Sequence, residues 1–300
     1  MSGKIKIALC LFGLPRCSRV TIPSLESNII DLLRKCGELE VYYHLFFQEK
    51  IENPRSGESG DLDSSNYDFI NPYKGILEPP PKVEGSSLYQ ILVDKGDDCG
   101  DNGKSMKNLL MQLHSLSTVG KQALASQPDV MVFARPDLLY HNPINTKIIQ
   151  YVSRNPKACA IPDWHWFKGC NDRFAICGKA IGEDYFSRQK WIPEFCPKAK
   201  KFFQSEALLR YALKKGKAQL IAIPLNASRV RLGGMIKEEL IDQCRWTPSN
   251  VFRFYLKRIY NRIKREENRD APPLYRPNSR DILIDYWRAW MRYQMINRLL

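Results

Sequence analysis

The feature of this sequence that most constrains its fold is the apolar run from Val130 to Tyr140, which is interrupted once, by Arg135-Pro136-Asp137. A continuous apolar run of this length is typical of a strand buried on both faces, as in the parallel sheets of α/β proteins. Pro136 cannot donate a hydrogen bond to a sheet, so strand pairing is expected to stop there. Ligands of open α/β sheets bind outside the carboxyl ends of the strands, which makes Arg135 and Asp137 candidate ligand-binding residues. A strand-ending turn with a solvated or capping aspartate explains the same residues without a ligand.

Strand and helix patterns alternate on both sides of this run and predict an α/β fold with a mixed, mostly parallel sheet flanked by helices. Residues 4–12 and 39–47 have strand composition, and the residues from Ser24 to Cys36 between them have helical spacing. This order predicts a βαβ unit with a parallel strand pair. Further strands are predicted at 158–162 and 218–223, and further helices at 106–125, 144–152, 184–188, 202–215 and 236–242.

Composition divides the chain into two expected parts. Residues 1–245 are expected to form the α/β domain, within which residues 48–104 are rich in Pro, Gly, Ser, Asp and Asn. This stretch is predicted to be a long loop or insertion, with short strands or helices near 67–70 and 87–93. Residues 246–300 are aromatic and basic at helical spacing, and they predict a basic amphipathic helical segment packed on the domain. Peripheral contact with a membrane surface is the alternative role for this segment.

The net charge of +14, from 46 Lys and Arg against 32 Asp and Glu, favours an anionic partner. Nucleotide phosphates, nucleic acid and an acidic membrane surface all fit this charge. The nine cysteines contain no CxxC pair, and the apolar N-terminal stretch is too short to span a bilayer and precedes no cleavage signal. We therefore expect reduced thiols in a cytoplasmic protein that is soluble or peripheral to a membrane.

Two groups of polar residues are candidates for a site. Gly13 and Arg16 follow the first predicted strand and suit a diphosphate, although an ordinary basic turn explains them equally well. The second group suits a sugar, because aromatic faces stack on sugar rings and carboxylates bind hydroxyls or remove a proton. Burying so many polar groups for packing alone would be costly. This second group consists of Asp163, Trp164, His165, Trp166, Asn171, Asp172 and Arg173.

Several enzyme classes lack their signatures in this sequence. There is no GxSxG, HExxH or Walker A motif, and the Gly13 turn is not GxGxxG, which argues against a dinucleotide-binding enzyme. Instead, six segments in order resemble the nucleotide-sugar glycosyltransferases of surface-glycan synthesis, which occur in lipopolysaccharide and capsule loci and in large algal viruses. The segments are ALCLFGLPR (8–16), VYYHLFF (41–47), MQLHSL (111–116), PDVMVFARPDLLY (128–140), IPDWHWFKGCNDRFAICG (161–178) and FFQSEALLRYALKKG (202–216).

The resemblance implies a GT-A-like catalytic domain over residues 1–245, with a nucleotide-binding α/β half and an acceptor half made by later loops. Gly13, Arg16, Arg135 and Asp137 would then lie at the donor diphosphate. Asp137 corresponds to the family's donor or metal aspartate, which implies Mn²⁺ or Mg²⁺ as cofactor. Because Arg135 stands where a full DxD motif has an acid, metal dependence stays open.

The acceptor half would contain Asn171, Asp172 and Arg173 of the NDRF segment, beside Trp164, His165 and Trp166. The implied reaction moves a hexose or pentose from a nucleoside-diphosphate donor, such as a UDP- or GDP-sugar, to a hydroxyl of a growing glycan. An inverting enzyme needs a carboxylate base, for which Asp172 is the first candidate and Asp163 the second. A retaining enzyme needs neither.

A basic nucleic-acid- or membrane-surface-binding protein without catalysis is the competing interpretation. The net charge and the basic, aromatic C-terminal segment favour it. The sequence contains no RRM, KH or zinc-knuckle signature, so a nucleic-acid partner is not expected.

Overall fold

The computed structural model describes residues 4–53, 56–96, 100–166, 169–199, 203–245, 247, 249–250 and 279–299. Of the basic helical segment expected over residues 246–300, the part between residues 251 and 278 lies outside the described residues.

The centre of the fold is a seven-stranded sheet with the strand order β10-β8-β9-β6-β1-β2-β5. All pairings in it are parallel except the two made by β9, which runs antiparallel to β6 and β8. The expected α/β fold class, with a mixed and mostly parallel sheet flanked by helices, is therefore confirmed. The seven strands are β1 (Ile5–Gly13), β2 (Gly37–Phe46), β5 (Lys74–Glu78), β6 (Val130–Ala134), β8 (Ala158–Pro162), β9 (Phe174–Gly178) and β10 (Gln219–Ile223).

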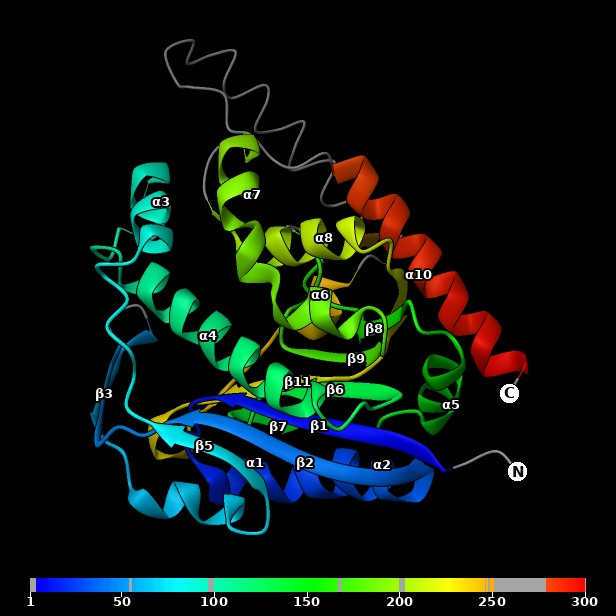
Figure 1. Ribbon diagram of the computed structural model, residues 1–300, viewed down its shortest axis with the longest axis horizontal. Helices are drawn as coiled ribbons and strands as arrows, with labels where there is room; N and C mark the ends of the chain where they lie inside the picture. The colour runs from blue at the N-terminus through cyan, green and yellow to red at the C-terminus, as the bar shows by residue number, and fades with distance from the viewer. Residues whose placement is uncertain are drawn as a thin grey trace.

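Helices cover both faces of this sheet (Figure 1). On one face lie α1 (Ser18–Leu25), the π-helical turn η1 (Glu26–Ile30), α2 (Asp31–Cys36) and α5 (Thr146–Arg154). On the other lie α4 (Lys104–Leu124), α6 (Gly182–Phe186), α8 (Ser205–Lys215) and α10 (Ser279–Leu299). Two short helices, α3 (Ser87–Lys95) and α7 (Ile192–Lys198), pack against each other beside α4.

Strand β1 shows why the sheet needs both layers. Successive side chains of a strand point to opposite faces. Leu9 and Leu11 pack in the core on the α1 side, whereas Cys10 and Phe12 pack in the core on the α4 side. All four are fully buried, so a strand of this composition is stable only when helices cover both of its faces.

The apolar run from Val130 to Tyr140 forms two strands rather than one. It leaves the central sheet after Ala134, and β7 (Leu138–Tyr140) then pairs antiparallel with β11 (Ala227–Val230) in a second, three-stranded sheet. The break falls at Pro136, where a missing backbone N–H was expected to end the pairing. The third strand of this small sheet is β12 (Ile236–Lys237).

Two local predictions need correction. Residues 48–104 contain three strands that were not predicted, because β5 extends the central sheet and β3 (Lys50–Asn53) pairs with β4 (Glu58–Asp61) in a hairpin. The short elements expected near 67–70 and 87–93 are present, as a 3₁₀ segment and as α3. Residues 236–242 form no α-helix, since Ile236–Lys237 pairs with β11 and a 3₁₀ turn, η6 (Ile241–Cys244), follows. Two further 3₁₀ segments, η3 (Ser64–Ile70) and η4 (Arg188–Trp191), and the short turn η5 (Leu232–Gly234) complete the elements.

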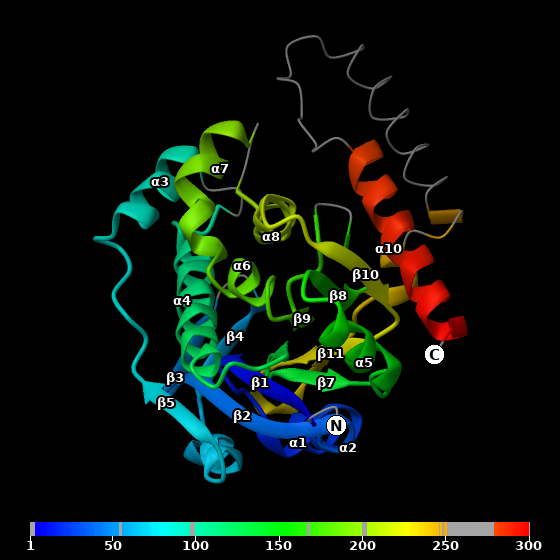
Figure 2. The same ribbon diagram turned by 45° about the vertical axis from the view of Figure 1, so that its right-hand side comes forward.

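The described part of the C-terminal segment, α10, packs along β10 at the end of the sheet (Figure 2). Ile282 and Tyr286 of α10 enter the core on the α4 side. Arg210 of α8 donates to the Asp285 carboxylate, and Arg292 donates to the Leu220 carbonyl oxygen at 2.8 Å. A membrane-spanning helix would need a longer apolar stretch than any helix in the described residues has.

Candidate functional site

A pocket of about 740 Å³ lies at the edge of the sheet where the carboxyl ends of β1, β2 and β6 meet the amino end of β9. Gly13 ends β1, Phe46 ends β2, Arg135 follows β6 and Arg173 precedes β9, and all four line the pocket. The volume lies in the range of pockets that hold small-molecule ligands. The site predicted from the strand-end rule thus coincides with a real cavity.

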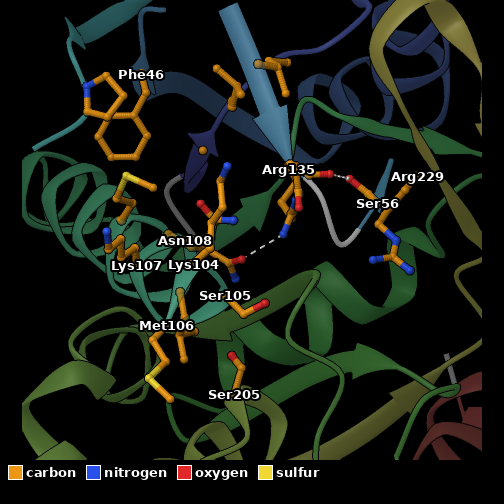
Figure 3. A pocket seen from close by; sticks show the side chains of 18 of the residues that line it. Phe46, Ser56, Lys104, Ser105, Met106, Lys107, Asn108, Arg135, Ser205 and Arg229 are labelled. Carbon is orange, nitrogen blue, oxygen red and sulfur yellow. Dashed lines mark hydrogen bonds between the residues drawn. The ribbon is translucent and has the colours of Figure 1, made fainter. Parts of the chain in front are cut away.

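The other walls come from segments outside the central sheet (Figure 3). The first turn of α4 contributes Lys104 to Lys107, and the start of α8 contributes Ser205. In Figure 3, Arg135 lies between this turn of α4 and Arg229 of β11, with Ser205 below them. The β3–β4 hairpin closes a further side, with Ser56 among its lining residues.

The lining of the pocket is strongly basic. Nine Lys or Arg side chains line it against three acidic ones, Glu52, Asp172 and Glu206. A concave surface with such an excess of one charge raises the local concentration of the opposite charge. The pocket is therefore suited to an anion. The nine cations are Arg16, Lys50, Lys104, Lys107, Arg135, Arg173, Arg229, Arg231 and Lys237.

Asp137 lies beneath the pocket rather than in its wall, and only 1% of it is exposed. Arg135 holds both carboxylate oxygens, with Nε at 2.9 Å from Oδ1 and Nη2 at 2.8 Å from Oδ2. Arg16 donates to Oδ2 as well. Both arginines line the pocket, so Asp137 holds in place two cations that face a ligand.

The expected metal does not fit at Asp137. Burial acts to raise the pKa of this carboxyl group, but Arg135 and Arg16 hold the pKa well below its usual range. Both oxygens accept from guanidinium groups, and the nearest charges are positive. A divalent cation would have to displace these donors and sit beside two arginines.

Two further buried acids orient the other arginines of the wall. Glu58 of β4 accepts from Arg231 at 2.8 Å and lies 3.3 Å from Nε of Arg16. Glu239 accepts from Arg229 at 2.6 Å and lies 3.3 Å from Nη1 of Arg173. Each acid thus holds two guanidinium groups of the pocket wall in place.

The cations of this wall exceed the acids that hold them. The pKa of Lys237 lies below its usual range, chiefly because Arg229 is close. Burial, with Arg229 as the next cause, also lowers the pKa of Arg173. A bound anion would relieve this repulsion between the cations.

Asp172 lines the pocket opposite Arg135. Ser205 donates its hydroxyl to Oδ2 of Asp172 at 2.6 Å, and Gln112, which also accepts from Arg135, lies 3.5 Å from the same oxygen. Burial acts to raise the pKa of Asp172, but Arg188 and the Ser205 hydrogen bond lower it below its usual range. Asp172 is therefore an ionised carboxylate at neutral pH.

The loop before Asp172 is held against the start of α8 by a close backbone approach. Cys170 N–H donates to the Glu206 carbonyl oxygen at 3.0 Å, and a Cβ built on Gly169 would lie 2.1 Å from that oxygen. Only glycine fits at this position without moving the loop. The contact places Ser205 and Asp172 side by side.

Three of the residues expected at the acceptor lie in the core instead. Trp164 and Trp166 are fully buried and donate their indole N–H groups to carbonyl oxygens of Leu225 and Pro162. Asn171 is 1% exposed and bridges the Trp164 carbonyl oxygen and the Arg173 N–H. Their faces and amide groups are used within the fold, so the structure does not support sugar stacking by these tryptophans.

Of the other four members of this group, Asp172 and Arg173 line the pocket, whereas Asp163 and His165 lie outside its lining. Asp163 is 6% exposed, is paired with Arg245 at 2.9 Å, and has its pKa raised by burial. His165 is partly exposed, has a φ of +59° and lies with Nε2 3.5 Å from Glu239. Of the predicted site residues, the pocket therefore unites Gly13, Arg16, Arg135, Asp172 and Arg173.

Sequence reasoning missed the basic residues at the start of α4 and those in and around β11 and β12. Arg229 lies in β11, Arg231 directly follows this strand, and Lys237 lies in β12. All three are distant in sequence from the strand ends that they face, so no local motif marks them.

One group in the described residues has the ligand types and closeness needed to hold a metal ion. His44, Glu78 and His114 each offer an atom within 4.8 Å of the others. None of the three residues lines the pocket. The group is nevertheless close to it, because the ring of Phe46, which lines the pocket, stacks on the ring of His114.

No protein-family model matches the chain, and no curated protein sequence matches it. Solved structures do resemble it. Core-mannan synthase A from Aspergillus fumigatus, in an Mn/GDP form, has 8% sequence identity and a TM-score of 0.44 over 82% of this chain and 82% of the other. The mannosyltransferase Ktr4p from S. cerevisiae has 9% identity and a TM-score of 0.46 over 82% of this chain and 79% of the other.

Proposed function

We propose that the chain is a glycosyltransferase that binds a nucleoside-diphosphate sugar in the basic pocket. The observation that carries this proposal is the wall of guanidinium groups around Asp172 at the strand ends. Arginine forks match the oxygens of a diphosphate, and a single carboxylate beside them provides a base for an acceptor hydroxyl. The resemblance of the sequence segments to nucleotide-sugar glycosyltransferases supports the same function.

In this function the arginines replace the charge that a metal ion supplies in other transferases. Negative charge builds on the diphosphate as the bond to the sugar breaks, and fixed cations beside it lower the barrier. Arg16 and Arg135 are held by Asp137 below, and Arg229 is held by Glu239 beside it. These buried pairs fix the guanidinium groups before the donor binds, so little reorganisation is needed during the reaction.

Asp172 is the proposed base. Its lowered pKa keeps it ionised, and the Ser205 hydroxyl fixes one of its oxygens at 2.6 Å. Because it ionises below the usual aspartate range, we expect activity to fall on the acid side only below about pH 4. The same proposal has three further parts. The reaction inverts the configuration of the sugar, the transferred sugar is a hexose or a pentose, and the enzyme acts in the cytoplasm in the synthesis of a surface glycan.

Melting temperatures measured with a panel of UDP, GDP, CDP and their sugars test the proposal and identify the nucleobase of the donor. Saturating one site at 100 times its dissociation constant adds about 2.7 kcal/mol of stability, which raises the melting temperature. We expect one nucleotide to raise it and the corresponding sugar nucleotide to be hydrolysed slowly without acceptor. If no nucleotide raises it while heparin binds the protein with a steep salt dependence, the competing polyanion-binding function is supported instead.

Lys237→Ala is expected to weaken binding of that nucleotide about tenfold, or ~1.4 kcal/mol, because a charge-assisted contact to phosphate is lost. The measurement is a calorimetric titration. Lys179→Ala is the matched control, since Lys179 is exposed and follows β9 at the opposite edge of the sheet. Equal losses in both variants would point to a general charge effect and contradict a phosphate contact at Lys237.

A further inference from the structure

A second candidate site lies beside the pocket, where β2, β5 and α4 meet. In the parallel pairing of β2 with β5, His44 is opposite Ile76 and Phe46 is opposite Glu78. Alternate residues of a strand share a face, so His44 and Glu78 project from the same face of the sheet. Helix α4 covers that face and brings His114 to them.

Three ligand atoms converge at this point. Nε2 of His44 lies 3.0 Å from Oε1 of Glu78, and Nε2 of His114 lies 3.1 Å from the same oxygen. In a tetrahedral zinc site with bonds of 2.0–2.1 Å, ligand atoms are about 3.3 Å apart. Small rotations of Glu78 and His114, whose side chains are 38% and 43% exposed, would open the triangle enough to admit an ion.

One of the three groups is held firmly by the fold, and the three together are ligands of the kind that zinc prefers. His44 is fully buried, and its carbonyl oxygen accepts from Ser115, the neighbour of His114 on α4. Two imidazoles and one carboxylate are a ligand set that zinc takes, and the partly exposed side chains of Glu78 and His114 leave solvent access for a fourth ligand.

We propose that His44, Glu78 and His114 bind a divalent transition-metal ion of the zinc type that ties the edge strand β5 to helix α4. Imidazole ligands favour Zn²⁺ and Co²⁺ over Mg²⁺ and Mn²⁺. The ion lies outside the basic pocket, so its role is to stabilise the wall that carries Phe46 rather than to contact the donor. The proposal does not depend on the function proposed above.

The test is titration of chelator-treated, reduced protein with Zn²⁺, Co²⁺ and Mg²⁺, followed by calorimetry and melting temperature. We expect one Zn²⁺ per chain, a raised melting temperature, the visible spectrum of Co²⁺ with nitrogen and oxygen ligands, and no response to Mg²⁺. Glu78→Gln and His114→Ala should each weaken Zn²⁺ binding by roughly 10- to 100-fold or more, since even outer-shell changes cost this much.

Glu40→Gln and His141→Ala are the matched controls. Glu40 pairs with Lys74 across the same two strands, and His141 contacts Ser228 away from the site. Both variants should bind Zn²⁺ as the unmodified chain does. The proposal is overturned if Zn²⁺ does not bind, if Mg²⁺ binds equally well, or if binding survives in Glu78→Gln and His114→Ala, which would assign it to other residues such as the thiols.

Discussion

Replacing Asp172 by Asn is expected to lower kcat for sugar transfer by roughly 10²- to 10⁴-fold, the range that a general base contributes. Asparagine keeps the shape of the side chain but cannot take a proton from the acceptor hydroxyl. The affinity for the nucleotide should stay the same or rise, because a negative charge beside the diphosphate is removed. The measurements are steady-state transfer kinetics and nucleotide calorimetry on the same preparation.

A structural effect of this substitution has to be separated from the chemical one. Asp172 also offsets the charge of Arg188, which is fully buried, so Asp172→Asn is expected to melt at a lower temperature. Ser205→Ala provides a second variant that keeps the carboxylate and removes only its hydrogen bond. Its kcat should fall much less, with the acid limb of the pH–rate profile shifted upward because the pKa of Asp172 rises. Unchanged turnover in folded Asp172→Asn would sink the assignment of Asp172 as the base.

The second large effect is expected at Asp137, and it concerns stability. Asp137→Asn leaves Arg16 and Arg135 without their shared carboxylate in a buried setting, which should cost about 3 kcal/mol of unfolding free energy. Urea unfolding measures this cost. The loss should be the same with EDTA and with Mn²⁺, because both carboxylate oxygens bind arginine. The opposite result would be an Asp137→Asn variant with the same free energy of unfolding as the unmodified chain and with no Mn²⁺ binding. That result would show that Asp137 is a metal ligand.

The pH dependence of this cost has a definite sign. The folded-state pKa of Asp137 is lowered, so its stabilising contribution is complete above the unfolded-state pKa of about 3.9 and is lost as pH falls toward the folded-state pKa. The gap between Asp137→Asn and the unmodified chain should therefore narrow below about pH 4. Asp129→Asn is the matched control at the other end of β6. There the amide oxygen can still accept from Lys6 N–H, and the change should cost less than about 0.5 kcal/mol.

The strand ends of the site could be predicted from the sequence because they depend on local patterns. The apolar run at Val130 and the proline at 136 placed Arg135 at the end of a buried strand, where the pocket lies. The turn at Gly13, with a φ of +105°, followed from the same reasoning for β1. Such signals need only the period of a strand and the residues that end it.

The remainder of the site depends on pairings between distant segments. Composition alone could not show that Trp164 and Trp166 use their indole N–H groups on nearby carbonyl oxygens, which removes the cost of burying them. Asp137 likewise has a partner 121 residues away in Arg16, and this pairing turns an apparent metal ligand into a support for arginines. Strand β5, within residues 48–104, was not predicted because its stability comes from pairing with β2 and not from its own exposed residues.

The central claim is that this pocket binds a nucleoside diphosphate through its own arginines and lysines. Its most direct test is calorimetric titration of the nucleotide found in the panel, once with EDTA and once with Mn²⁺. EDTA would also remove an ion from the proposed site at His44, Glu78 and His114. The same titration of Glu78→Gln therefore shows whether loss of that ion changes nucleotide binding. The account predicts the same dissociation constant under both conditions, in both chains. Binding that requires Mn²⁺ would contradict it.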